Sequence, residues 1–244
     1  MGSIWKNIKK VFIGIPILNR LDLLIRCIGA LDYPSDVIIV NNNSSDNEFN
    51  YQLNSLTHQR GLQVLHQKRN LGVAASWNLI IRSGIARGYE WIFIGSNDTF
   101  LTPGSLKKAV EVRKDATVGV WHLHAFNFFL LRKMTIDLVG WFDKNFYPAY
   151  KEDQDYSYRC WLAGVNRLPS IPGCGAEHIG SATIKSDRHF RNCNQRTHSR
   201  NTDYYRLKWG GDANQEVFTR PFNQPDYKWW QEANANIGVR DWTE

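Results

Sequence analysis

The sequence has few cysteines, and they are widely scattered. Four occur among the 244 residues, at Cys27, Cys160, Cys174 and Cys193. No Cys-x-x-Cys pair is present, so the spacing argues against a zinc knuckle and against a dense disulfide framework. We expect four reduced thiols.

The sequence also lacks a long hydrophobic run. The apolar stretches at 11–18 and 91–94 are interrupted or followed by Gly or Pro. Both are far shorter than the roughly 20 residues that a membrane-spanning helix needs. Residues 1–10 carry lysines without a following apolar segment and cleavage site, and Lys6 stands where a myristoylation signal has Ser or Thr. These features predict a cytosolic protein with no membrane span.

Several catalytic fingerprints are missing. There is no Gly-x-Gly-x-x-Gly or Gly-Lys-Ser/Thr loop, which argues against dinucleotide enzymes and P-loop NTPases. There is no Gly-x-Ser-x-Gly elbow, and no cysteine has a recognisable base beside it. Hydrolysis by a nucleophilic triad is therefore disfavoured.

The overall composition is that of a globular chain with an excess of positive charge. Apolar residues make up 43% and charged residues 22%, which fits one large domain or two small ones. The net charge of +7 favours phosphate-bearing partners, either nucleic acid or a nucleotide-linked small molecule. Ten Trp residues suit a heavy core, bases or sugar faces equally well.

The first half alternates short β-rich runs with helical stretches. We predict strands at 11–15, 36–40, 62–65 and 91–94, with helices at 21–31 and 74–86. This alternation is typical of an α/β fold with a mostly parallel central sheet flanked by helices.

Polar residues follow two of these strands directly, and a proline ends a third. The segment after 36–40 is Asn-Asn-Asn-Ser-Ser-Asp, the segment after 91–94 is Gly-Ser-Asn-Asp, and Pro16 stops the first strand. Ligands of open α/β sheets bind beyond the carboxyl ends of the strands, where loops and helix N-termini converge. The sequence thus predicts a single nucleotide site at that edge.

The second half is less regular. We predict extended strands at 118–131, a loop rich in Gly and aromatic residues at 138–150, and a helix at 153–163. Residues 186–244 are polar, basic and Trp-rich with weak periodicity, so we expect an irregular tail packed on the same domain. The catalytic domain would then be 1–185, with a nucleotide half at about 10–104 and an acceptor half at about 105–185.

Three carboxylates fall within four residues at the start of the predicted helix at 153–163: Glu152, Asp153 and Asp155. Acidic residues at a helix start stabilise the helix dipole, which is one explanation. The other is a general base, because a carboxylate among carboxylates keeps a raised proton affinity.

Asp98 and His178 form a second candidate constellation. Asp98 follows a buried strand, and most such residues only cap a turn, while a lone His is more often structural than a ligand. Together, however, their oxygen and imidazole ligands suit Mn²⁺ or Mg²⁺ bridging a diphosphate.

In order along the chain, these segments resemble glycosyltransferase family 2, which has the GT-A fold. The resemblance runs from about 11 to 183 and rests on seven segments. They are 15–20, 39–46, 69–78, 97–104, 139–146, 152–159 and 177–180. The small size also resembles the glycosyltransferases of large algal viruses, which would place the protein in a host cytoplasm.

The resemblance implies an inverting, metal-dependent transfer from a nucleotide sugar, most often a UDP-sugar such as UDP-xylose or UDP-glucose, to a glycan or glycoprotein hydroxyl. Asp153 matches the catalytic base, supported by Glu152 and Asp155, while Asp98 and His178 match metal ligands. The residues that match the nucleotide pocket are Pro16, Asn19, Asn41, Asn43, Arg69, Asn78, Asn97 and Asp98.

Two positions depart from the family pattern. Asn41 replaces the usual Asp, so a neutral amide stands where a carboxylate accepts from the base. The Asp-x-Asp motif is reduced to Ser-Asn-Asp at 96–98, which leaves one carboxylate for the metal. Uridine preference is less firmly implied, and we expect weak metal affinity without nucleotide.

The acceptor side is less specified. Aromatic side chains flank the predicted base, and aromatic faces commonly stack on sugars. Of these we favour Trp141 and Tyr150 as acceptor contacts, with core packing as the alternative. In the tail, Arg206 or Lys208 would meet the diphosphate.

Two other functions fit parts of the sequence. A sugar-phosphate nucleotidyltransferase shares the order of elements, but it needs a Gly-rich basic loop where this chain has Pro-Ile-Leu-Asn at 16–19. A non-catalytic sugar- or nucleic-acid-binding module fits the charge and the aromatics, yet no RNA-binding signature is present. We therefore expect no nucleic-acid partner.

Overall fold

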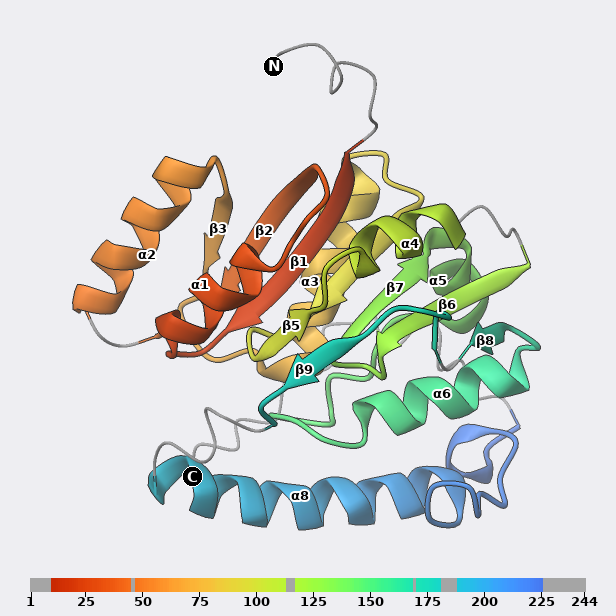
Figure 1. Ribbon diagram of the computed structural model, residues 1–244. Helices are drawn as coiled ribbons and strands as arrows, with labels where there is room; N and C mark the ends of the chain where they lie inside the picture. Colours follow the sequence, from red (N-terminus) through yellow and green to blue (C-terminus); the bar gives the residue numbers. More distant parts are fainter. Residues whose placement is uncertain (1–9, 45–46, 113–116, 169, 181–187, 226–244) are drawn as a thin grey trace.

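A seven-stranded sheet forms the centre of the protein (Figure 1). The computed structural model describes residues 10–44, 47–112, 117–168, 170–180 and 188–225. The strands, in their order across the sheet, are β3 (Gln63–His66), β2 (Ser35–Asn41), β1 (Val11–Ile17), β4 (Trp91–Gly95), β7 (Phe128–Arg132), β6 (Val118–His124) and β8 (Asn166–Leu168). β7 runs antiparallel to both its neighbours, and the other pairings are parallel. The predicted mostly parallel sheet is confirmed.

Helices cover both faces of this sheet. They are α1 (Leu21–Gly29), α2 (Asn47–Arg60), α3 (Gly72–Ala86), α4 (Ser105–Val112), α5 (Lys133–Val139) and α6 (Glu152–Leu162). A small second sheet pairs β5 (Thr99–Leu101) with β9 (Ala176–His178) in antiparallel register. Among the described residues, no helix has the length and apolarity to span a bilayer.

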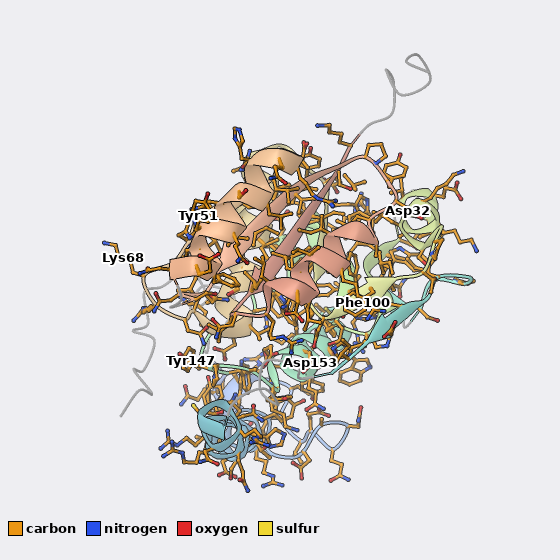
Figure 2. The ribbon with its side chains drawn as sticks, turned by 60° about the vertical axis from the view of Figure 1, so that its left-hand side comes forward. Asp32, Tyr51, Lys68, Phe100, Tyr147 and Asp153 are labelled. Atoms are coloured by element: carbon orange, nitrogen blue, oxygen red, sulfur yellow. The ribbon has the colours of Figure 1, made fainter. Side chains whose placement is uncertain are left out.

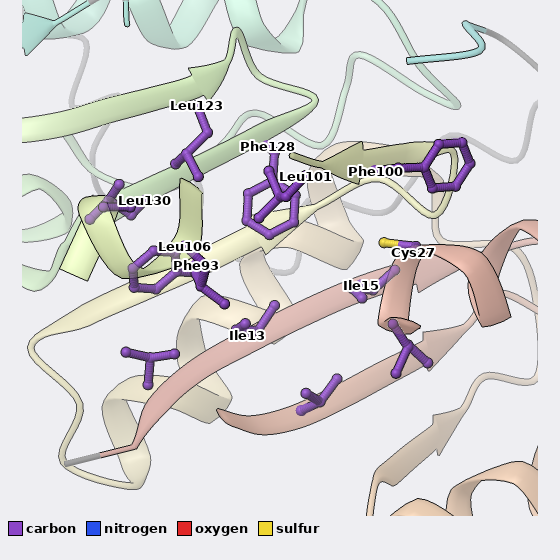
Figure 3. Close-up of a cluster of buried hydrophobic side chains, with 14 of the residues drawn as sticks. Ile13, Ile15, Cys27, Phe93, Phe100, Leu101, Leu106, Leu123, Phe128 and Leu130 are labelled. Carbon is purple, nitrogen blue, oxygen red and sulfur yellow. The ribbon is translucent and has the colours of Figure 1, made fainter. Parts of the chain in front are cut away.

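Alternation along the central strands divides the core into two layers. Ile13 and Ile15 of β1 pack with Phe93 and Leu106 on one face (Figure 3), and Phe12 packs on the other. Burial on both faces explains why these strands are almost continuously apolar.

Gly14 permits the close packing of α3 on β1. A Cβ atom at this position would lie 2.1 Å from Ile80 Cγ2, well inside van der Waals contact. The absent side chain therefore lets the helix approach the strand that leads to the predicted ligand edge.

The C-terminal extension begins with a helix of 22 residues, α8 (Arg188–Trp209), where we predicted irregular structure. Its periodicity is weak because apolar burial is concentrated near its end, where Tyr205 and Trp209 pack on Phe146. A short 3₁₀ helix, η1 (Pro221–Asn223), follows. In Figure 1, α8 runs along the underside of the domain next to α6. Residues 226–244, the rest of the predicted tail, lie outside the described residues.

Candidate functional site

A cavity of about 580 Å³ lies beyond the carboxyl ends of the central strands. Residues 16–18 at the end of β1, Asn42 after β2 and residues 96–98 after β4 line it. Residues of α6 and α8 form other parts of the wall. This volume falls within the roughly 300–1,000 Å³ of small-molecule sites. The three strand ends therefore converge as the sequence predicts.

Asp98 and His178 meet in this cavity. His178 Nε2 lies 3.3 Å from Asp98 Oδ1, and both residues line the wall. Pairing of β5 with β9 sets Thr99 opposite His178, and the Ile179 amide donates to the Asp98 carbonyl. Neighbouring ligands of one octahedral ion are about 3 Å apart, so the spacing and the donor types fit a shared divalent cation.

A second imidazole and a side-chain amide lie near this pair. The His124 ring lies 5.4 Å from the His178 ring, and Asn127 Nδ2 is 3.2 Å from His124 Nδ1. Across the part of the chain that the structure describes, no group of three His, Cys, Asp or Glu residues is arranged to hold a metal. A cation at this pair would depend on further oxygen ligands from elsewhere, such as a diphosphate.

Two carboxyl groups of the first turn of α6 face the same cavity. Glu152 is buried and Asp153 is partly exposed; Figure 2 shows Asp153 and Tyr147 between the sheet and α8. Burial raises the pKa of Glu152 well above its ordinary value, and the neighbouring Asp153 raises it further. Burial also raises the pKa of Asp153, although backbone amides partly oppose the shift. These are properties of a carboxylate suited to accept a proton.

A strained turn leads into this helix. Tyr150 and Lys151 both have φ of 76°, a left-handed conformation that non-glycine residues rarely adopt. Asn201 of α8 donates from Nδ2 to the carbonyls of Ala149 and Tyr150, at 2.8 and 3.1 Å. The C-terminal helix thus holds the turn that directs Asp153 into the cavity.

Asp155, the third carboxylate of the motif, lies outside the cavity and is fully buried. Its Oδ2 accepts from Arg159 at 2.7–2.8 Å, and its Oδ1 accepts from Trp209 Nε1 at 2.9 Å and lies 2.7 Å from Lys208 Nζ. With its acceptor sites occupied, the side chain anchors α8 to α6. This location does not suit contact with an acceptor hydroxyl.

Asp143 completes the buried ionic cluster. It lies 2.7 Å from Lys208 Nζ and accepts from the Tyr204 hydroxyl at 3.0 Å. Burial alone would raise the pKa of Asp143, but attraction and hydrogen bonding to Lys208 outweigh it and lower the pKa to about 2. Lys208 is consequently a structural cation, and Arg206 pairs with Asp212 at the surface. Neither occupies the predicted diphosphate position.

Half of the predicted site residues line the cavity. They are Pro16, Asn97, Asp98, Tyr150, Glu152, Asp153 and His178. The other seven lie elsewhere, and they are Asn19, Asn41, Asn43, Arg69, Asn78, Trp141 and Asp155.

Two of the predicted nucleotide residues are used inside the protein. The Asn78 amide donates to the Phe142 carbonyl at 2.8 Å and accepts from the Phe142 amide at 2.9 Å, which ties α3 to the loop before α6. Asn41 donates to Asn50 at 2.8 Å and accepts from the Ser44 amide at 3.0 Å. Both side chains are buried, so their hydrogen-bonding capacity is already spent on the fold.

The remaining predicted residues lie at the surface or in turns. Arg69 and Asn43 are exposed, and Asn43 has φ of 60° in the turn after β2. Asn19 has φ of 57°, and its amide donates to the Ser44 hydroxyl at 2.9 Å. Trp141 carries the Arg82 guanidinium 5.1 Å above its ring and is absent from the cavity wall.

Sequence reasoning missed Asn42, the middle residue of the Asn triplet. It lines the cavity, and its Oδ1 accepts from the Leu71 amide at 3.2 Å and from Ser76 Oγ at 3.1 Å. Asn41, the last residue of β2, bonds to Asn50 instead, and the alternation of side chains along a strand was the available signal that its neighbour faces another way. Asn70 and the α8 residues were also missed, and Tyr147, one of the aromatic residues that flank the predicted base, was not among the two favoured as acceptor contacts.

The comparisons with known proteins agree with this arrangement. The family model described as Glycosyl transferase family 2 matches residues 12–163, more than half of the chain. The chain belongs to this family. A galactofuranosyl glycosyltransferase of Leishmania donovani is 35% identical over 95 residues, which cover 34% of this chain and 22% of that protein.

Solved structures show the same fold. The mannosyltransferase PcManGT from Pyrobaculum calidifontis, in complex with GDP-Man and Mn²⁺, has a TM-score of 0.56 and 16% identity, covering 78% of this chain and 62% of that one. GalNAc-T7 with UDP, GalNAc and Mn²⁺ has a TM-score of 0.60 and 12% identity, with coverages of 71% and 44%. S. aureus TarS 1–349 with UDP-GlcNAc has a TM-score of 0.53 and 16% identity, with coverages of 71% and 61%. At these identities the likeness establishes the GT-A fold of this family 2 chain.

Proposed function

We propose that this protein is an inverting, metal-dependent glycosyltransferase that moves a sugar from a nucleotide-diphosphate donor to a hydroxyl of a glycan or glycoprotein. One observation carries the proposal. A paired oxygen and imidazole ligand set, Asp98 and His178, shares a cavity with the carboxyl groups of Glu152 and Asp153. The first pair suits a diphosphate and its cation, and the second suits proton transfer.

Mn²⁺ or Mg²⁺ is the cofactor that these residues fit. Asp98 and His178 would hold the ion, and the donor diphosphate would supply further oxygen ligands. When bound, the cation would neutralise negative charge on the departing nucleotide. The structures of PcManGT and GalNAc-T7, both with Mn²⁺, support this choice.

The donor nucleotide would lie along the strand ends. Pro16, Asn42, Asn70 and Asn97 line this part of the cavity, and the side-chain amides of Asn70 and Asn97 would contact ribose and base. UDP-sugars, such as UDP-xylose or UDP-glucose, are our first choice of donor. The UDP-GlcNAc complex of TarS supports a uridine nucleotide. Because PcManGT was solved with GDP-Man, guanosine nucleotides are also included in the binding test below.

Asp153 would act as the general base. It takes the proton of the acceptor hydroxyl while that oxygen bonds to the anomeric carbon. The bond from this carbon to the diphosphate oxygen breaks, and its electron pair leaves with the nucleoside diphosphate. Attack from the face opposite the leaving group inverts the anomeric centre. Glu152 lies buried beside the base, and the raised proton affinity of Asp153 itself comes from burial.

The acceptor would enter beside the aromatic residues near α6. Tyr147 and Tyr150 line the cavity next to Asp153, and Trp77 and Phe126 form a second aromatic group in the wall. Aromatic faces stack on sugar rings, so this wall suits a glycan or a glycosylated protein. Trp141 lies outside the cavity and contributes at most to the support of this wall.

Binding and stereochemistry test the proposal together. UDP, GDP and dTDP should be titrated with and without Mn²⁺, and one should bind more tightly with the metal. Proton NMR of the sugar first released from an α-linked donor should then show the β-anomer. Release of the α-anomer would contradict inversion. Salt-sensitive binding of oligonucleotides without nucleotide binding would instead favour the binding-module alternative.

A further inference from the structure

One face of α8 forms a wall of the cavity. The helix residues that line it follow a spacing of three and four, which places them on one side of the helix. They are Cys193, Asn194, Arg196, Thr197 and Arg200. This helix lies beyond residue 163, where the match to the family ends.

The backbone of this wall is held in place by buried contacts. Lys208 lies 2.7 Å from both Asp143 and Asp155, and Trp209 donates to Asp155 at 2.9 Å. One turn after Arg196 and Thr197, Asn201 bonds to the carbonyls of the turn before α6. The position of the wall relative to Asp153 is therefore built into the fold, and no closing motion is needed to form it.

The wall brings two cations to a cavity whose other charged groups are mostly acidic. Arg196 and Arg200 are the Lys or Arg side chains among the described lining residues, which otherwise include Asp98, Glu152 and Asp153. Within the described part of the chain, Arg196 forms no ion pair, whereas Arg206, further along α8, pairs with Asp212. A guanidinium that faces a ligand cavity without a carboxylate partner is suited to an incoming oxyanion.

We propose that Arg196 and Arg200 form an anion-binding site for phosphate oxygens, occupied by the diphosphate of the nucleotide donor. The inference rests on the proposed function. A divalent cation balances the two negative charges of a sugar-linked diphosphate but not the carboxylate of Asp98 as well, and the departing nucleoside diphosphate gains a further negative charge. Two arginines on the facing wall stabilise that charge as it develops. A phosphate or carboxylate group of the acceptor could bind the same two arginines. The experiment below distinguishes this anion from the donor diphosphate.

The test compares the double variant Arg196→Gln/Arg200→Gln with Arg191→Gln, a control on the same helix that is exposed and absent from the cavity wall. Calorimetry measures binding of UDP with Mn²⁺, of uridine, and of inorganic pyrophosphate. We expect the double variant to lose about ten-fold or more in UDP affinity and to bind uridine as the wild type does. The control should match the wild type for all three ligands.

Binding of pyrophosphate to the UDP-saturated protein shows whether the site takes the donor diphosphate or an anionic group of the acceptor. If UDP with Mn²⁺ displaces pyrophosphate from the wild type and the double variant binds neither well, the site takes the donor diphosphate. If pyrophosphate still binds the UDP-saturated wild type but not the saturated double variant, the site takes an anionic acceptor group.

The inference fails if the double variant binds both UDP and pyrophosphate as tightly as the wild type. A wild type that binds neither uridine nor UDP would instead contradict the proposed function. In that event the anion-binding site is tested by pyrophosphate alone. Weaker pyrophosphate binding by the double variant than by the wild type supports the site, and equal binding overturns it. Unchanged melting temperatures show that the variants fold.

Discussion

Lys208 Nζ lies 2.7 Å from Asp155 Oδ1, and this buried ion pair joins the C-terminal helix α8 to the first turn of α6. Asp155 follows the proposed base Asp153 by two residues, so the contact fixes the helix that carries the base. The C-terminal extension therefore supports the helix that carries the proposed base, although it lies beyond the family match.

Asp155→Asn should destabilise the fold. The substitution leaves Lys208 and Arg159 buried with a single carboxylate between them, and breaking a buried pair costs about 3–5 kcal/mol. Urea denaturation should show a lower midpoint. The control is Asp212→Asn, whose pair with Arg206 is exposed and should contribute little. Equal midpoints for the two variants would mean that the buried cluster does not secure α8.

Asp153→Asn should preserve donor binding and remove transfer. The base acts on the acceptor in the transition state, so UDP affinity with Mn²⁺ should match the wild type while the transfer rate falls about 100-fold to 10,000-fold. Because burial raises the pKa of Asp153, wild-type activity should fall on acidification through a pKa above the ordinary value of 3.8. A parallel loss of UDP affinity in the variant would remove Asp153 from the role of base.

Asp98→Asn and His178→Ala should each abolish the gain in UDP affinity that Mn²⁺ provides. The two side chains are the proposed ligands from the protein, and neither alone holds the ion well. Calorimetric titration of UDP with and without Mn²⁺ measures the effect. His58→Ala, an exposed position on α2, is the matched control. A variant that keeps the full Mn²⁺ response does not carry a metal ligand.

Glu152→Gln should stabilise the protein at neutral and alkaline pH. Burial raises the pKa of Glu152, so the folded state holds this proton more tightly than the unfolded chain does. The associated stability is complete below the ordinary value of 4.5 and is lost as the pH rises through the folded-state pKa. Gln imitates the protonated form at every pH.

Melting curves at several pH values test this expectation. The variant should gain several degrees over the wild type at pH 8, since about 1 kcal/mol corresponds to ~2–4 °C for a protein of this size. The gain should shrink towards pH 4. A constant difference across this range would show that ionisation of Glu152 does not influence stability.

The sheet edge could be predicted because two local patterns coincide there. Continuous apolar runs predict strands that are buried on both faces. The polar segments at 41–46 and 95–98 indicate where two of these strands end. The placement of Pro16, Asn97 and Asp98 on the cavity wall follows from these patterns.

Side-chain direction within those segments could not be predicted so well. Asn41 and Asn42 are neighbours with the same chemistry, but strand geometry turns one towards Asn50 and the other towards the cavity. Likewise, Asp153 and Asp155 differ by two residues on a helix, and one faces the cavity while the other is buried against Trp209. Composition does not distinguish such neighbours.

The position of α8 could not be predicted from the sequence, because the residues that it contacts are far away along the chain. Its partners Asp143, Ala149, Tyr150 and Asp155 lie more than 50 residues earlier in the chain. Polar and basic residues on most of the helix obscure its apolar face, since only its last turns pack against Phe146. Three-dimensional contacts were needed to find the wall that carries Arg196.

The most direct test of the account is acceptor-independent nucleotide release across a panel of UDP-, GDP- and dTDP-sugars, with and without Mn²⁺. The account predicts slow hydrolysis of one donor by the wild type, dependent on Mn²⁺ and greatly reduced in Asp153→Asn. A folded wild type that releases no nucleotide from any donor and does not bind UDP in the presence of Mn²⁺ would contradict it.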